Sequence, residues 1–164
     1  MRLLLLLLAF CALPAQAQLP LKPWAGGATP TLELASLDGQ PQRLEDYRGR
    51  VVLVNFWATW CAPCLEEMPS IEKLRRSLDA QRFTVLAVNV GEGRPAASAF
   101  AEKMGLGFTF LLDREMKTSR AWGARVLPAT FIVDPAGKVR YSYYGAIDWS
   151  RPDVRAAIRD LVVE

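Results

Sequence analysis

The chain has 164 residues, with 20 Lys and Arg, 17 Asp and Glu, 3 Cys and no His. The absence of histidine excludes Ser-His and Cys-His catalytic pairs, His-ligated metals and a histidine pH switch. A formal net charge of +3, with both signs interspersed, is too small to indicate nucleic acid or an anionic membrane surface as the main partner. The length predicts one domain.

The first 17 residues have the pattern of a secretory signal peptide. Arg2 supplies one positive charge, an apolar run follows from Leu3 to Leu13, and Ala15-Gln16-Ala17 is a small-x-small cleavage signal. Because this run is shorter than the roughly 20 residues that span a bilayer, cleavage is favoured over retention as a membrane anchor. A lipid anchor on Cys11 is a third alternative, disfavoured by the bulky residue before it. We therefore expect an exported, periplasmic protein.

A linker and a small hairpin are expected next. Residues 18–30 are rich in proline and glycine, a composition typical of a flexible linker. The folded domain is expected to cover residues 31–164. It begins with Thr31–Leu34 and Pro41–Leu44, which flank Asp38-Gly39 and predict an N-terminal hairpin.

Two cysteines follow a predicted buried strand. Val51–Trp57 is a continuous apolar run rich in β-branched and aromatic residues, and apolar residues at helical spacing follow from Leu65 to Leu78. Cys61 therefore lies at or near the N-cap of a helix, where unpaired N–H groups and the helix dipole are expected to lower the pKa of its thiol. Cys64, one turn further, is expected to be the more buried thiol.

These two cysteines form a C-x-x-C pair, the only thiols left after removal of residues 1–17. As a structural disulfide the pair would close a four-residue loop and stabilise the fold by only about 2 kcal/mol in the chain-entropy model. A structural zinc site needs four Cys or His ligands, so we expect no metal and no other cofactor. Redox exchange is favoured, in which one thiolate attacks a partner disulfide and the second thiol resolves the mixed disulfide.

Strands and helices alternate in the rest of the chain. The sequence predicts strands over Phe83–Val90, Phe108–Leu112, Ala129–Val133 and Val139–Tyr144, and helices over Ala96 to about Gly105, Lys117–Trp122 and Ser150 to about Val162. Gly91-Glu92-Gly93 lacks the spacing of a nucleotide-binding loop and is interpreted as a turn near the active site.

Two separated motifs carry a family resemblance. The segment Val54–Pro69, VNFWATWCAPCLEEMP, resembles the active-site segment of exported thioredoxin-like thiol-disulfide oxidoreductases of the TlpA/ResA/CcmG type, and Val126–Asp134, VLPATFIVD, is a second match. The resemblance extends from about Thr31 to the C-terminus. It implies an α/β thioredoxin-like fold with a central mixed β-sheet flanked by helices, an N-terminal hairpin and an inserted αβ unit.

The resemblance also implies roles for the residues of the first motif. Cys61 would be the nucleophile, Cys64 the resolving thiol, and Glu67, three residues later on the same helix face, the group that exchanges a proton with Cys64. A solvated helix carboxylate is the alternative for Glu67. Asn55 stands where thioredoxins proper have a buried Asp, which puts the proton relay of that Asp in doubt here. Asn55 is equally compatible with a strand amide that is satisfied by the backbone.

Three further residues are implied to bind the partner protein. The peptide bond before Pro128 would be cis, although sequence alone favours trans. The backbone of Leu127 would pair with an extended segment of the partner by strand addition. Trp60, beside Cys61, would contribute to the docking surface, with a place in the core as its alternative, whereas Trp57 is interpreted as core.

The function implied is thiol–disulfide exchange on other exported proteins, in the reducing direction, as in cytochrome c maturation or related metal-site assembly. A reductant in an oxidising compartment needs a membrane thiol-disulfide electron donor, and the chain is expected to act as a monomer. An oxidant is the first alternative. A Cu(I) metallochaperone using the two thiolates is another, although the C-x-x-x-C and distant His of Sco-type carriers are missing. Neither cysteine has the upstream pattern of a peroxiredoxin, and no residues remain for the dimerisation domain of an isomerase.

Overall fold

The structure, a computed structural model, describes residues 20–163, so the predicted signal peptide over residues 1–17 lies outside the described residues. The strands are β1 (Lys22–Pro23), β2 (Glu33–Ser36), β3 (Pro41–Arg43), β4 (Val51–Trp57), β5 (Phe83–Val90), β6 (Thr109–Asp113), β7 (Ala129–Val133) and β8 (Val139–Tyr144). The helices are α1 (Ala62–Arg76), α2 (Arg94–Met104), α3 (Lys117–Ala121) and α4 (Pro152–Val163), with a short 3₁₀ helix, η1 (Leu44–Tyr47).

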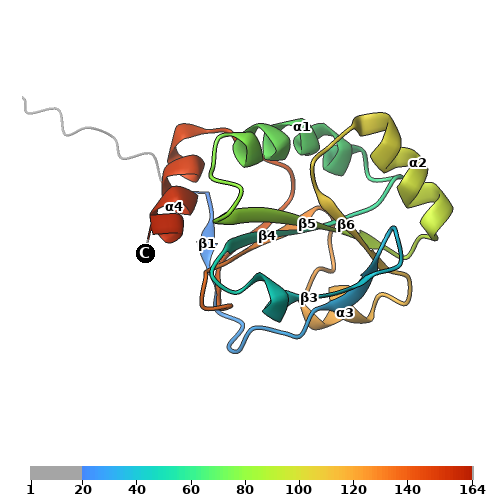
Figure 1. The fold of residues 1–164 in the computed structure, drawn as a ribbon, viewed down its shortest axis with the longest axis horizontal. Helices are drawn as coiled ribbons and strands as arrows, with labels where there is room; N and C mark the ends of the chain where they lie inside the picture. Colours follow the sequence, from blue (N-terminus) through green and yellow to red (C-terminus); the bar gives the residue numbers. More distant parts are fainter. Residues whose placement is uncertain (1–19, 164) are drawn as a thin grey trace, which may run out of the picture.

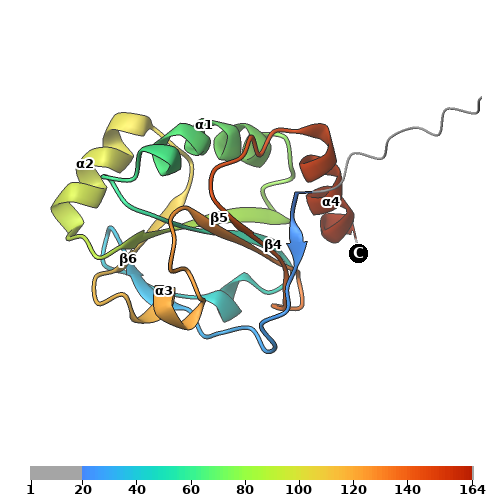
Figure 2. The ribbon, with the colours of Figure 1, turned by 180° about the vertical axis from the view of Figure 1, so that it is seen from behind.

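The strands form one mixed sheet in the order β1-β8-β7-β4-β5-β6-β2-β3. Strands β4, β5 and β6 are parallel, while β7 pairs antiparallel with β4. Figures 1 and 2 show α1, α2 and α4 on one face of the sheet and α3 with η1 on the other. The expected central mixed sheet flanked by helices is confirmed.

The central strand β4 is buried over its whole length, which explains why six of its seven residues are apolar. Because side chains alternate along a strand, Val51 and Leu53 pack with α1 and α4, whereas Val54 and Phe56 pack in the core on the opposite face. Asn55 takes a position on the α1 side that an apolar residue would otherwise occupy, and it is 1% exposed. A buried amide at the centre of the sheet therefore stands out as a candidate for a specific role.

The N-terminal hairpin and the αβ unit lie together at one side of the sheet. β2 pairs with β3 in the predicted hairpin and also with β6, while α2 and β6 form the unit that follows β5. The helix begins at Arg94, two residues earlier than predicted, because Pro95 fits the first turn of a helix, where backbone N–H groups have no intrahelical partner.

The expectation of a flexible linker over residues 18–30 is wrong for the part that the structure describes. Leu21 is 3% exposed and packs in the core between the sheet and α4, and β1 pairs antiparallel with β8. Trp24 contacts Phe131 edge to face, with ring centroids 5.6 Å apart, and the Thr29 hydroxyl accepts a hydrogen bond of 2.9 Å from Val139 N–H. The proline and glycine content concealed these apolar anchors, so the folded domain begins before residue 31.

Candidate active site

Cys61 and Cys64 form a disulfide at the junction of β4 and α1. Cys61 is the N-cap of α1, as predicted, and its N–H donates to Ala58 O at 3.2 Å. Cys64 lies one turn into the helix and is fully buried, while Cys61 is 5% exposed. Since the first N–H groups of a helix are unpaired and carry partial positive charge, this position favours a thiolate on Cys61 when the pair is reduced.

Glu67 lies on the buried side of α1, one turn after Cys64, and is only 3% exposed. Its carboxylate accepts hydrogen bonds from Asn55 Nδ2 at 2.8 Å, Trp149 Nε1 at 3.0 Å and Ile147 N–H at 3.4 Å. Burial raises the pKa of Glu67 from 4.5 to about 7, and the hydrogen bonds from Trp149, Asn55 and Ile147 oppose that increase. A solvated helix carboxylate is therefore excluded, and the group can gain or lose a proton near neutral pH.

Asn55 connects Glu67 to strand β7. Its Nδ2 group donates to Glu67 Oε1 and also to Thr130 Oγ1, at 2.9 Å. Its Oδ1 atom is buried and has no hydrogen-bond partner among the described residues. The alternative of an amide satisfied by the backbone is wrong, because both bonds of Nδ2 go to side chains.

A solvent-accessible groove reaches Glu67 from outside. It has a volume of about 540 Å³ and runs between α1 and the loop that joins β8 to α4. Its lining includes Glu67 together with Glu66, Lys73 and Asp148. The buried carboxylate thus has a route along which protons can exchange with water.

The second sequence motif meets the first at the end of the sheet. The Leu127–Pro128 peptide bond is cis, as the resemblance implied, and Leu127 packs against the apolar cluster that contains both cysteines. The antiparallel register places Ala129, the next residue, opposite Phe56 of β4. Residues that are more than 60 positions apart in the sequence are therefore brought together by one strand pair.

Large apolar side chains are exposed beside the disulfide. Trp60 is 71% exposed, which rules out its interpretation as core, and Val126, next to Leu127, is 62% exposed. Trp57 is fully buried, as predicted. Val126 was not singled out in the sequence, although an apolar residue directly before the Leu-Pro pair was the available signal.

Glu92 is a second carboxylate near the site that the sequence analysis did not single out. It accepts hydrogen bonds from Thr59 N–H and from Asn89 Nδ2, each at 2.7 Å, and from the Thr59 hydroxyl. Although burial alone would raise the pKa of Glu92, the hydrogen bonds from Thr59 and Asn89 hold it below its ordinary value. Glu92 anchors the turn that precedes Cys61, and the predicted turn over residues 91–93 does lie near the active site.

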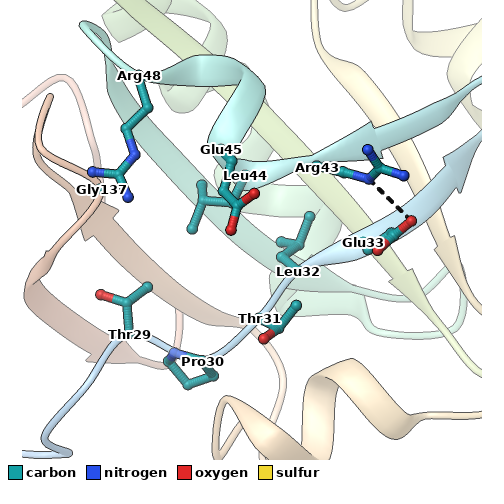
Figure 3. A pocket seen from close by; sticks show the side chains of 10 residues that line it. All are labelled: Thr29, Pro30, Thr31, Leu32, Glu33, Arg43, Leu44, Glu45, Arg48 and Gly137. Atoms are coloured by element: carbon teal, nitrogen blue, oxygen red, sulfur yellow. Dashed lines mark hydrogen bonds and ion pairs between the residues drawn. The ribbon is translucent and has the colours of Figure 1, made fainter.

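Another cavity, of about 160 Å³, lies on the opposite face of the sheet from α1 (Figure 3). It is enclosed by residues 29–33, η1 and the turn after β7, and an ion pair between Arg43 and Glu33 lies at one side. None of the sequence-predicted site residues lines this cavity.

Residues 20–163 contain no group of three or more His, Cys, Asp or Glu side chains that is arranged to hold a metal ion. None of the helices in this range combines the length and apolar character needed to cross a membrane.

The sequence is similar to that of known proteins that carry out thiol-disulfide chemistry. A family model described as Redoxin matches residues 24–158. Thiol-disulfide oxidoreductase ResA from Geobacillus thermodenitrificans is 38% identical over 136 residues, which are 83% of this chain and 77% of the relative.

Two solved structures resemble the fold over most of their length. The structure of a secreted thiol-disulfide isomerase from Corynebacterium glutamicum has a TM-score of 0.75 and 29% identity, and the match covers 82% of this chain and 85% of that one. A structure from Chlorobium tepidum assigned as thiol:disulfide interchange protein DsbE has a TM-score of 0.70 and 29% identity, covering 83% and 93% of the two chains. With its C-x-x-C disulfide at the N-terminus of α1, the chain belongs to the Redoxin family and is a thiol-disulfide oxidoreductase of the ResA/DsbE type.

Proposed function

We propose that the chain is a reductant of disulfides in other exported proteins. The observation that carries this proposal is the buried Glu67 one turn after the buried Cys64, with a pKa of about 7. A reductant needs its second thiol to become a thiolate inside the protein, and a carboxylate that is partly ionised at neutral pH is a suitable proton acceptor.

The exchange has two steps. The Cys61 thiolate attacks one sulfur of the substrate disulfide, so that a mixed disulfide forms and the other substrate sulfur leaves as a thiolate. Cys64 then gives its proton to Glu67 and attacks Cys61 Sγ, which forms the Cys61–Cys64 disulfide and releases the second substrate thiolate. Two electrons pass to the substrate, and both substrate sulfurs take up protons.

Substrate docking is proposed on the exposed surface beside the disulfide. The exposed side chains of Trp60 and Val126 support apolar contacts there. We propose that the backbone of Leu127, before the cis Pro128, pairs with an extended segment of the substrate. This geometry suits a flexible segment of a partner protein that contains a disulfide. We propose apocytochrome c before haem attachment, or a copper-site protein during its assembly, as the substrate class.

The oxidised pair must be reduced again by a dithiol. Residues 1–17 have the pattern of a secretory signal peptide, so we propose that the enzyme acts in the periplasm. We further propose that it acts as a monomer and receives electrons from a membrane thiol-disulfide protein. N-terminal sequencing of the exported protein tests cleavage after Ala17 against a retained anchor.

The reduction potential of the Cys61/Cys64 couple tests the direction. The domain is equilibrated with glutathione buffers and free thiols are quantified. A value near or below that of thioredoxin, about −270 mV, is expected for a reductant. A value near about −120 mV, as for DsbA, would show an oxidant instead. A Cys64→Ser variant, which leaves the mixed disulfide on Cys61 unresolved, traps the substrate for identification.

A further inference from the structure

Asn55 differs in kind from the other groups that bind the Glu67 carboxylate. The Trp149 indole N–H and the Ile147 backbone N–H are donors only, so neither can accept a hydrogen bond from a protonated carboxyl group. The side-chain amide of Asn55 has a donor end and an acceptor end. It is therefore the one partner among these three that can respond to protonation of Glu67 by turning over.

The observed arrangement matches the ionised carboxylate. Three donors point at the two Glu67 oxygens, and an ionised carboxylate is an acceptor only. In this state the amide of Asn55 uses both N–H groups, toward Glu67 and Thr130, and leaves its buried Oδ1 without a partner. An orphaned buried carbonyl is costly, so its position calls for an explanation.

The unpartnered Oδ1 lies in the layer that contains the resolving thiol. Asn55 is on the α1 side of β4, between Leu53 and Trp57, and Trp57 packs in the same apolar cluster as Cys64. Cys64 is one turn before Glu67 on the buried side of α1. When the disulfide is reduced, Cys64 becomes a thiol that can donate to an acceptor, or a thiolate that can accept from a donor.

We propose that the Asn55 amide is a two-position switch that couples the proton on Glu67 to the charge on Cys64. With Glu67 ionised, Nδ2 faces Glu67 and Oδ1 accepts from the Cys64 thiol. After the proton passes from Cys64 to Glu67, the amide turns over: Oδ1 accepts from the new Glu67 O–H, and Nδ2 donates to the Cys64 thiolate. No electrons move in this step; one S–H bond breaks and one O–H bond forms.

Thr130 is compatible with both positions of the amide. Its hydroxyl accepts from Nδ2 in the observed state and can rotate to donate to Oδ1 after the turnover. Every polar atom of the amide is then paired in both states of the reduced enzyme. Asn55 is a positioning residue, since it orders the two groups that exchange the proton, and the inference rests on the proposed proton transfer to Glu67.

The groups around Glu67 are either neutral or exposed, so we treat Glu67 and Cys64 as the coupled pair. Asn55 on β4, Thr130 on β7 and the indole of Trp149 are neutral, and the ionisable groups of the groove are Glu66, Lys73 and Asp148, all exposed at its lining. Cys61 at the start of α1 and Glu92, which binds Thr59 in the turn before it, are the further titratable groups on this side of the described structure. Neutral variants of the three groove residues separate the effect of their charges on the Glu67 titration from the effect of the Asn55 amide.

Asn89 provides a matched internal control. It is a fully buried asparagine on the neighbouring strand, it donates through Nδ2 to the carboxylate of Glu92, and its Oδ1 also lacks a partner in the described structure. Glu92 has a pKa below its ordinary value, so it stays ionised from pH 5 to 9. The Asn89 amide is therefore expected to keep one orientation over that range.

The test is an NMR titration of the reduced protein, labelled with ¹³C and ¹⁵N, from pH 5 to 9. As the pH rises, we expect the Asn55 amide protons to change their nuclear Overhauser contacts from the Cys64 β-protons to the Thr130 side, with the same midpoint as the Glu67 carboxyl carbon, while Asn89 does not change. If Glu67 titrates and the Asn55 contacts stay constant, the switch is overturned. Asn55→Leu, if it folds, should separate the two titrations and slow resolution of the mixed disulfide at least tenfold, whereas Asn55→Ser should restore part of the rate.

Activity of the wild type separates this inference from the proposed function. A wild type that reduces protein disulfides while the Asn55 amide keeps one orientation retains the proposed function and loses the switch. A wild type whose amide turns over with Glu67 but whose potential is that of an oxidant retains the switch and loses the proposed direction.

Discussion

The Trp149 indole donates a hydrogen bond of 3.0 Å to Glu67 Oε2, and this bond joins two residues that are 82 positions apart in the sequence. Both side chains are buried, Trp149 completely, so the bond lies inside the core between α1 and the loop before α4. The C-terminal part of the chain thereby controls the protonation of a group on the active-site helix.

Replacing Trp149 with Phe should raise the pKa of Glu67 above 7. The ring volume is largely kept, while one of the donors that stabilise the ionised carboxylate is lost. A rise of about one pKa unit leaves roughly a tenth of Glu67 ionised at pH 7, against about half in the wild type, so resolution of the mixed disulfide should slow about fivefold and recover above pH 8.5. The carboxyl-carbon titration of Glu67 by NMR measures this directly.

Trp122→Phe is the matched control for that variant. Trp122 is also fully buried and its indole donates to Thr31 O at 3.1 Å, on the opposite side of the sheet. Its replacement should destabilise the fold by a similar amount and leave the Glu67 titration unchanged. Equal shifts in the two variants would show that loss of core packing, and not loss of the donor, moves the pKa.

Stability should fall as the pH rises from about 5 to 8. Glu67 has a folded pKa of about 7 against an ordinary value of 4.5, so its protonated form is favoured by folding. The stabilisation is complete below pH 4.5 and is lost as the pH rises through 7, with an amplitude of about 3 kcal/mol at 1.36 kcal/mol per pKa unit. Because the chain has no histidine, the terminal amine is the main other group that titrates in this window.

Urea unfolding of the oxidised protein at several pH values measures that slope. Glu67→Gln should abolish the decline between pH 5 and 8, whatever its effect on absolute stability. Glu66→Gln, on the exposed side of the same helix, should retain it. A decline that persists in Glu67→Gln would assign the pH dependence to another group.

The opposite pH dependence is expected for Glu72. Hydrogen bonds from Arg75 lower its pKa to about 2, with further contributions from Arg76 and from Gly107 N–H, while burial opposes them. The carboxylate is thus stabilised when ionised, and this contribution is lost as the pH falls from about 4.5 to 2. Two cations on the basic face of α1, Arg75 and Arg76, thus form ion pairs with Glu72.

Glu72→Gln should destabilise the protein by about 1–2 kcal/mol at pH 7, an amount reduced by the exposure of Arg76, and by less at pH 3. Chemical denaturation at both pH values provides the comparison. Glu33→Gln breaks the exposed ion pair with Arg43 and should change stability by less than about 0.5 kcal/mol. A Glu72 effect as small as that of Glu33 would contradict the prediction.

Trp60→Ala should weaken docking of protein substrates without changing the disulfide chemistry. An indole that is 71% exposed beside the N-cap cysteine has no role in the core, and aromatic anchors of this kind are worth about 2 kcal/mol in interfaces. We expect KM for a disulfide-containing protein to rise about thirtyfold, with the reduction rate of hydroxyethyl disulfide and the potential unchanged. Trp60→Phe should restore most of the affinity; a parallel loss on the small disulfide would place Trp60 in the chemistry instead.

Several elements were predictable because their causes are local. Val51–Trp57 was predicted with its observed bounds, since a strand that is buried on both faces needs a continuous apolar run. The helical periodicity after it placed Cys61 at the N-cap. The cis bond before Pro128 came from the family resemblance alone, because the residues themselves favour trans. The ordered segment around β1 was missed, because its pairing partner in β8 lies over 100 residues away.

The sequence by itself determined the redox chemistry, because two cysteines three residues apart at the start of a helix are a property of one short segment. It also placed Glu67 on the same helix face as Cys64. Only the tertiary structure decided what that carboxylate can do. Its burial on the inner face of α1 raises its pKa. Its hydrogen-bond donors come from β4 and from the loop before α4, which lie 12, 80 and 82 residues away along the chain. Desolvation and hydrogen bonding depend on which groups surround an atom in space, so the protonation of Glu67 is a property of the folded chain.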